Sequence, residues 1–74
     1  MGELPNAVVK RLLNQHGGGL RVSGTAIDEA VKAAEDYIAR LAREAQALAV
    51  ADKRKTVMET DITKARTKIE SGGL

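Results

Sequence analysis

The chain has 74 residues and a formal net charge of +2, and it contains no cysteine, phenylalanine or tryptophan. Its length allows one domain at most, and disulfides and thiolate metal sites are excluded. Of its 32 apolar residues, 12 are alanine. Burial of apolar surface stabilises a fold by ~25 cal/mol per Å², and an alanine side chain offers little surface to bury. Because ordering costs roughly 1.5 kcal/mol per residue, a chain this small usually needs a staple, a metal or a partner. Composition therefore favours oligomerisation.

The first predicted element is a short helix over about residues 4–15. Pro5 suits its first position, because the N–H that proline lacks would have no partner there. The apolar residues at the spacing of one helical face are Val8, Val9, Leu12 and Leu13. The glycine run 17–19 ends the helix, since glycine accepts left-handed conformations. No Gly-Lys-Ser/Thr follows this run, so a phosphate-binding P-loop is not expected.

The second predicted element is a long helix over about residues 25–52, after a short extended piece at 20–22. Ser23 and Thr25 are both candidate N-caps, and residues 25–28 fit a capping box. A heptad-like apolar seam follows the helix through Ile27, Val31, Ala34, Ile38, Leu41, Ala45 and Leu48. At 1.5 Å per residue the helix is about 42 Å long. Neither flanking helix covers that length, so the seam is expected to meet a second chain rather than to complete a monomeric bundle.

The third predicted element is a short helix that ends at about Glu70. Residues 56–59 fit a second capping box, with Met58 as the alternative boundary residue. One face carries Ile62, Ala65, Arg66 and Ile69. Residues 70–74 are expected to form a frayed tail. The predicted class is all-α, with a short helix, a loop, a long helix, a loop and a short helix in one domain over residues 1–74.

Charge and reactive residues narrow the function. Acidic residues concentrate in the middle of the chain, and basic residues gather near the breaks between helices. His16, the only histidine, is expected to be a solvated residue at a helix end, and no spacing suggests a metal site or a catalytic group. We therefore expect no enzyme, no cofactor and no metal. No signal peptide or apolar span of roughly 20 residues is present, which predicts a protein without membrane contact, in the cytoplasm or wherever the chromosome lies.

Several short segments resemble the histone fold, and most closely an archaeal-type histone. They are residues 3–5, Arg11, residues 21–23, residues 54–57 and residues 61–62. The interval between the Arg-Val-Ser and Arg-Lys-Thr segments matches the family without a gap, and the resemblance covers about residues 3–69. It implies a homodimer in which the long helices of two chains cross in a handshake. It also implies that double-stranded DNA bends or wraps around this dimer without base-specific reading.

The resemblance implies roles for individual residues. Arg21 matches the arginine that enters the minor groove, where a narrow groove attracts cations. The other residues expected to contact the DNA backbone are Lys10, Arg11, Ser23, Lys53, Lys55 and Thr56. Of these, Ser23 stands at a helix N-terminus, which offers amide donors to phosphates. Arg54 is expected to pair with Asp61 and brace the second loop, although a role as a free DNA-binding cation is an alternative.

Some positions depart from the family's pattern. Asn14 stands where relatives often carry lysine, and the first loop is slightly longer than usual. At the end of the long helix, Ala51 replaces the histidine that stacking dimers commonly use, and Lys64 replaces an apolar residue. We therefore expect at most a weak dimer–dimer contact near Leu48, Ala51, Asp61 and Lys64. Two other functions stay open: a histone-fold subunit that requires a different partner chain, and a helical interaction module without a DNA role.

Overall fold

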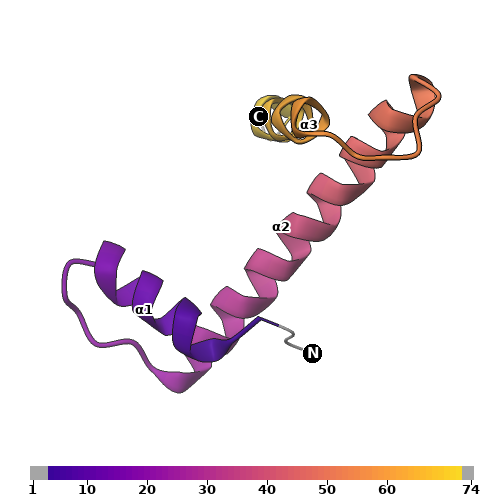
Figure 1. The fold of residues 1–74 in the computed structure, drawn as a ribbon. Helices are drawn as coiled ribbons and strands as arrows, with labels where there is room; N and C mark the ends of the chain where they lie inside the picture. The colour runs from indigo at the N-terminus through magenta and orange to yellow at the C-terminus, as the bar shows by residue number, and fades with distance from the viewer. Residues whose placement is uncertain (1–3, 73–74) are drawn as a thin grey trace. The chain divides into compact units, whose positions relative to one another are not determined.

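The computed structural model describes residues 4–72 and contains three helices, α1 (Asn6–His16), α2 (Gly24–Ala51) and α3 (Glu59–Gly72) (Figure 1). No strand occurs between residues 4 and 72. The all-α class and the short, long, short order of helices are therefore confirmed. The frayed tail expected over residues 70–74 is wrong for residues 70–72, because α3 continues to Gly72. Gly73, Leu74 and Glu3 of the first motif lie outside the described residues.

The chain divides into two compact units, Met1–Tyr37 and Ile38–Leu74. The first unit contains α1, the loop that follows it (residues 17–23, loop 1) and the first half of α2. The second contains the rest of α2, the loop before α3 (residues 52–58, loop 2) and α3 itself. The predicted DNA-contact residues therefore form two groups. One group lies near loop 1 in the first unit, and the other lies near loop 2 in the second unit.

Proline and glycine set the bounds of α1. Pro5 lies just before the helix with φ −64°, and its carbonyl accepts a hydrogen bond from Val9 N–H at 3.2 Å. Pro5 is therefore the residue before the helix. The sequence had suggested that it would be the first residue of the helix. Beyond His16, Gly18 and Gly19 have φ of 71° and 81°. These left-handed values favour glycine, so the glycine run stops the helix as predicted.

A serine cap starts α2. The hydroxyl oxygen of Ser23 accepts a hydrogen bond from Ala26 N–H at 3.1 Å, which satisfies one of the free amides of the first turn. Ser23 is therefore the N-cap. The alternative start at Thr25, with its capping box, is wrong because Thr25 already lies inside the helix, which begins at Gly24.

Loop 2 is closed at both ends by hydrogen bonds. At the end of α2, Lys53 N–H donates to Val50 O at 2.9 Å and Arg54 N–H donates to Ala49 O at 2.8 Å, the two bonds of a Schellman motif. Before α3, Met58 N–H donates to the carboxylate of Asp61 at 2.8 Å. Met58 is thus the boundary residue of α3, and the capping box at residues 56–59 does not form.

The buried core is small in both units. In the second unit the buried apolar residues are Ala45, Ala49, Ala65 and Ile69, and in the first the only one among the described residues is Val31. No large side chain within residues 4–72 is fully buried. An ion pair of 2.8 Å between Lys68 Nζ and Glu44 Oε1 adds a polar link between α3 and α2 in the second unit. The core is as thin as the alanine content indicated.

The apolar seam of α2 is only partly covered by the chain's own helices. Val31 and Ala45 are buried, whereas the side chain of Ile38 is 51% exposed. The remaining seam positions, which are all half-buried, are Ile27, Ala34, Leu41 and Leu48. Much of the apolar surface of this helix is therefore still exposed to solvent in a single chain.

Candidate functional site

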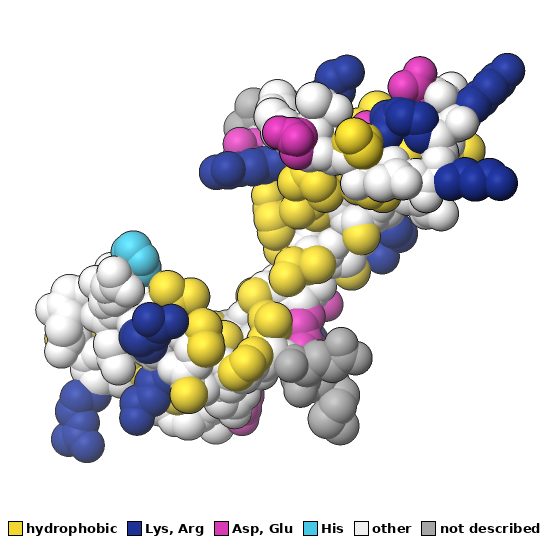
Figure 2. Space-filling view, viewed as in Figure 1, with side chains coloured by type: hydrophobic (Ala, Val, Ile, Leu, Met, Phe, Trp, Pro, Cys, Tyr) yellow, Lys and Arg dark blue, Asp and Glu magenta, His cyan; other side chains and the backbone are white. Residues whose placement is uncertain are grey.

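An apolar groove lies in the first unit between α1 and the first half of α2. It has a volume of about 530 Å³, and its walls come mainly from Val8, Val9, Leu12, Leu13, Ala30 and Ala34. Val8 and Leu12 are 41% and 45% exposed although both are apolar. Figure 2 shows hydrophobic side chains gathered along this side of α1 and the adjoining part of α2. The groove is a surface on which another apolar surface can pack.

One hydrogen bond joins the segment before α1 to α2 beside this groove. Leu4 N–H donates a hydrogen bond to the carboxylate of Glu35 at 3.1 Å, which ties the segment before α1 to α2. His16 also lines the groove and is exposed, as expected for a solvated residue at a helix end. The sequence offers no signal for the bond between Leu4 and Glu35, because the two residues are 31 positions apart.

Basic side chains of the first unit lie around loop 1. Lys10 and Arg21 line one hollow of about 370 Å³ together with Asn14 and residues 19–22. Arg11, the next residue on α1, is exposed and lines a neighbouring hollow with Lys10 and Asn14. The structure thus brings together three of the predicted DNA-contact residues. Ser23 is the fourth predicted DNA-contact residue of the first unit, and its hydroxyl oxygen accepts the hydrogen bond that caps α2.

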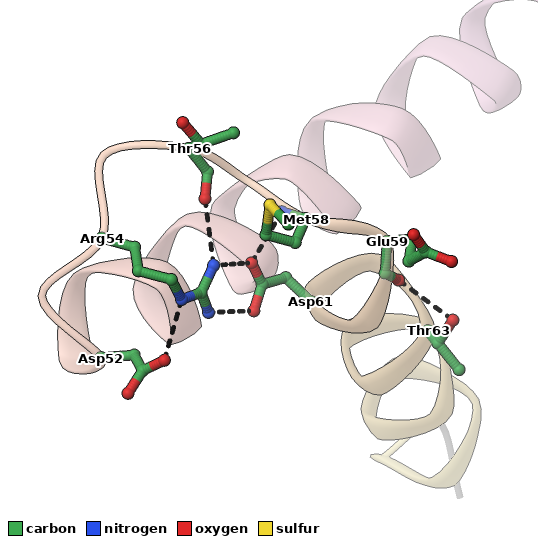
Figure 3. A network of polar contacts seen from close by, with 7 residues as sticks. All are labelled: Asp52, Arg54, Thr56, Met58, Glu59, Asp61 and Thr63. Carbon is green, nitrogen blue, oxygen red and sulfur yellow. Dashed lines mark hydrogen bonds and ion pairs between the residues drawn. The ribbon is translucent and has the colours of Figure 1, made fainter.

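Arg54 is the centre of a polar network in loop 2 (Figure 3). Its Nη1 and Nη2 atoms donate to the two carboxylate oxygens of Asp61 at 2.8 and 2.7 Å, a bidentate ion pair. Nη1 also donates to Thr56 O at 3.0 Å, and Nε donates to the carboxylate of Asp52 at 2.8 Å. All three nitrogens of the guanidinium are engaged within the loop. This geometry braces loop 2 and disfavours the alternative of Arg54 as a free cation.

The network shifts the ionisation of its members. The hydrogen bonds from Arg54, followed by the one from Met58 N–H, lower the pKa of Asp61 to about 2, against the opposing effect of burial. Hydrogen bonds to Asp61 and then Asp52 raise the pKa of Arg54 above its usual value. The pair therefore stays charged at any physiological pH.

The other cations of loop 2 are exposed. Lys53, Lys55 and Thr56 all lie on the surface, and Figure 2 shows Lys and Arg side chains that project from this part of the molecule. Neither lysine side chain forms a hydrogen bond or ion pair with any residue between 4 and 72. Their charges are thus available to an external anion.

A hollow of about 290 Å³ in the second unit is lined by Leu48, Ala51, Asp61 and Lys64, together with Asp52 and Arg54. The structure therefore places side by side the four residues at which a weak dimer–dimer contact was expected. Asp61 already accepts three hydrogen bonds there. The contact of Asp52 with Arg54 and the ion pair between Glu44 and Lys68 were not foreseen from the sequence.

Two classes of site are missing from the part of the chain that the structure describes. Residues 4–72 contain no group of three or more histidine or acidic residues that could hold a metal ion. None of the three helices is long and apolar enough to cross a membrane.

The family model Histone, which describes the core histone domain, matches residues 6–68. The chain belongs to the core histone family. The match covers α1, α2, both loops and most of α3, so the resemblance seen in the short motifs extends over most of the fold. This family packages DNA and is non-enzymatic, which supports a histone-type, DNA-binding role for the chain. No solved structure gave a significant match.

Proposed function

We propose that this histone is an archaeal-type architectural protein that pairs with a second copy of itself and bends or wraps double-stranded DNA without reading bases. The observation that carries the proposal is the open apolar groove of the first unit, which occurs in the same chain as two loops with exposed cations. We infer that the protein acts at the chromosome, in the cytoplasm of a cell with a nucleoid.

A second copy is the occupant we assign to the groove. A chain whose buried core consists mainly of alanine has little apolar burial to offset the ordering of its backbone. Ile38 at 51% exposure and Leu12 at 45% exposure would both lose solvent contact in a handshake between two long helices. In this proposal residues 1–74 of each chain form a single histone-fold domain, which is stable only when it is paired with a second copy.

The DNA-binding surface is assigned to the cations around the two loops. Arg21 would enter the minor groove, while Lys10, Arg11, Lys53, Lys55 and Thr56 would hold phosphates. The amides at the start of α2, capped by Ser23, add donors. Pairing doubles the charge of +2 per chain to +4, and each neutralised phosphate releases counterions. Binding is therefore expected to weaken steeply as salt increases, with a preference only for easily bent DNA.

Stacking of dimers is proposed to be weak. At the hollow near the end of α2, Ala51 has no side-chain hydrogen-bonding group, and Asp61 is occupied by Arg54 and Met58. Lys64 at the same hollow places a positive charge that would face its own copy if the contact were symmetric. These features favour separate dimers on DNA.

Light scattering of the purified chain, alone and with a duplex of about 60 base pairs (well below the persistence length of DNA), tests the proposal. We expect a folded dimer alone and a defined protein–DNA stoichiometry in the mixture. An unfolded or aggregating chain would instead favour the subunit that needs a different partner. A folded dimer without DNA affinity at low salt would favour an interaction module.

The variant Arg21→Ala separates DNA binding from folding. Arg21 is exposed in loop 1, so the variant is expected to fold as the wild type does. We expect it to lose on the order of 1 kcal/mol or more per site, twice in a dimer, from charge-assisted hydrogen bonds. Titration of a labelled duplex measures this loss. Unchanged affinity in a folded Arg21→Ala variant would contradict the assigned surface.

A further inference from the structure

Two arginines in the second half of α2 have no part in the proposed DNA contacts around the loops. Arg40 and Arg43 are exposed, and neither guanidinium forms a hydrogen bond or ion pair with another residue between 4 and 72. Because they are three positions apart on a helix, their side chains are neighbours on one side of it. The second unit therefore carries two adjacent cations whose charges are available to an external anion.

These arginines lie away from the apolar seam of α2. Successive residues of a helix are turned by about 100°, so Arg43, two positions from both Leu41 and Ala45, projects from the opposite side of the helix. Arg40 is likewise two positions from Ile38. A second copy that covers the seam, as proposed above, leaves both guanidinium groups in contact with solvent.

One acid lies near these arginines, but another cation is bound to it. Lys68 of α3 forms an ion pair of 2.8 Å with Oε1 of Glu44. The hydrogen bond and the charge of Lys68 lower the pKa of Glu44, and the charges of Arg40 and Arg43 add to this effect against that of burial. Three positive charges and one negative charge leave this cluster with a net charge of +2 per chain, which suits an anionic partner.

The cluster is separate from the DNA-contact residues of loop 2. Arg43 precedes Asp52, the first residue of that loop, by nine positions, which correspond to about 13 Å along the helix. Arg40 lies one further turn away. The Debye length at physiological ionic strength is about 8 Å, so salt screens the cluster from the charges of loop 2. The cluster can therefore bind an anion independently of the loop.

We propose that Arg40 and Arg43, beside Lys68, form a second DNA-binding surface, through which the protein holds a second duplex and bridges two DNA segments. The inference rests on the proposed DNA-binding function and deepens it. Guanidinium groups suit this role, because each can donate two parallel hydrogen bonds to a phosphate. Two paired chains present two such clusters, so the weak contacts of each cluster act together once the first duplex is bound.

The test is a bridging assay, in which a bead-bound duplex captures a second, labelled duplex only when the protein joins the two. We expect the wild type to capture the labelled duplex, and the double variant Arg40→Gln/Arg43→Gln to capture about fivefold less at moderate salt. The affinity of this variant for a single duplex should stay within about twofold of the wild type, because the loop cations are intact. Its Tm should not change, since both side chains are exposed and form no bonds.

Two further variants serve as controls. Arg40→Lys/Arg43→Lys keeps both charges and should retain most of the capture. Lys32→Gln removes an exposed cation from the first half of α2 and should capture as much labelled duplex as the wild type.

Equal capture by Arg40→Gln/Arg43→Gln and the wild type would overturn the inference. A wild type that binds one duplex without capturing a second would also overturn it, and would make an acidic protein the better partner for this surface. A loss of single-duplex affinity as large as the loss of capture would assign both arginines to the first surface instead. If the wild type binds no duplex even at low salt, the proposed function and this inference fail together.

Discussion

The two loops that flank α2 reach their conformations by different means. Loop 1 uses Gly18 and Gly19 for its left-handed backbone, and its one side-chain cap is Ser23. Loop 2 contains no glycine and forces Lys53 into the left-handed region. Backbone bonds close its end next to α2, and the side chains of Arg54 and Asp61 bond the backbone of Thr56 and Met58 near its other end. The residue types of loop 1 thus allow its conformation, whereas hydrogen bonds and an ion pair hold the conformation of loop 2. Substitutions should affect them by different mechanisms.

The largest loss of stability is expected when Asp61, which accepts three hydrogen bonds in loop 2, is replaced. Asp61→Ala leaves the guanidinium of Arg54 without its bidentate partner and frees the amide of Met58. Asp61→Ala removes two charge-assisted hydrogen bonds and the acceptor of the Met58 amide at once, so we expect the Tm to fall by about 10 °C or more, although Arg54 keeps its ion pair with Asp52. Circular dichroism during heating measures this. Asp61→Asn, which retains the shape of the side chain, should lose less; equal Tm values for Asp61→Ala and wild type would refute the bracing role of Arg54.

Acid should weaken the same loop at a defined pH. The pKa of Asp61 is lowered to about 2 in the folded chain from an ordinary value of 3.8, so its carboxylate stabilises the fold fully above pH 3.8. This contribution is lost as pH falls through about 2, when the folded state also takes up the proton. Tm measured from pH 5 to pH 2 should decrease more steeply for the wild type than for Asp61→Asn. Parallel curves for the two proteins would show that Asp61 is not the responsible group.

A smaller loss of stability is expected when a glycine of loop 1 is replaced. Gly18 has φ 71°, and a Cβ atom added there would meet open space, so Gly18→Ala adds backbone strain without a steric clash. We expect about 1 kcal/mol of destabilisation in urea unfolding. Gly24→Ala is the matched control, because it also faces open space but lies at the start of α2 without positive φ. That variant should be as stable as the wild type or slightly more stable.

The smallest effect concerns the cap of α2. Ser23→Ala removes the acceptor for Ala26 N–H and should cost about 0.5–1 kcal/mol, because that amide can turn to water at this exposed site. Ser23→Asp keeps an acceptor and should restore stability. If Ser23→Ala and Ser23→Asp unfold at the same urea concentration, the cap does not contribute to the start of the helix.

The sequence was sufficient for features that depend on local residue types. The glycine run 17–19 predicts the end of α1, and the regular spacing from Ile27 to Leu48 predicts a long helix without a break. The alanine content predicts a thin core, which the structure contains. Local rules did not decide between Ser23 and Thr25, since both are good caps and the choice depends on the path of loop 1.

Features that depend on tertiary contacts were not predictable. Nothing in the residue types of Glu44 and Lys68 indicates that they pair, because the pairing follows from how α3 packs on α2. The left-handed backbone at Lys53 was missed for a similar reason. A glycine at position 53 would have predicted the left-handed turn, whereas a lysine gives no local signal for it. The hydrogen bonds of Arg54 hold the turn instead.

The alanines buried in the second unit have a mechanical consequence. An alanine side chain has no rotamers, so Ala45, Ala49 and Ala65 lose no side-chain entropy when α3 packs, and they have no freedom to adjust to a larger neighbour. The separation of α2 and α3 is therefore set by methyl groups. Asp61 reaches Arg54 at 2.7 Å only while that separation is kept. The small core thus acts as a spacer that keeps the ion pair of loop 2 in register.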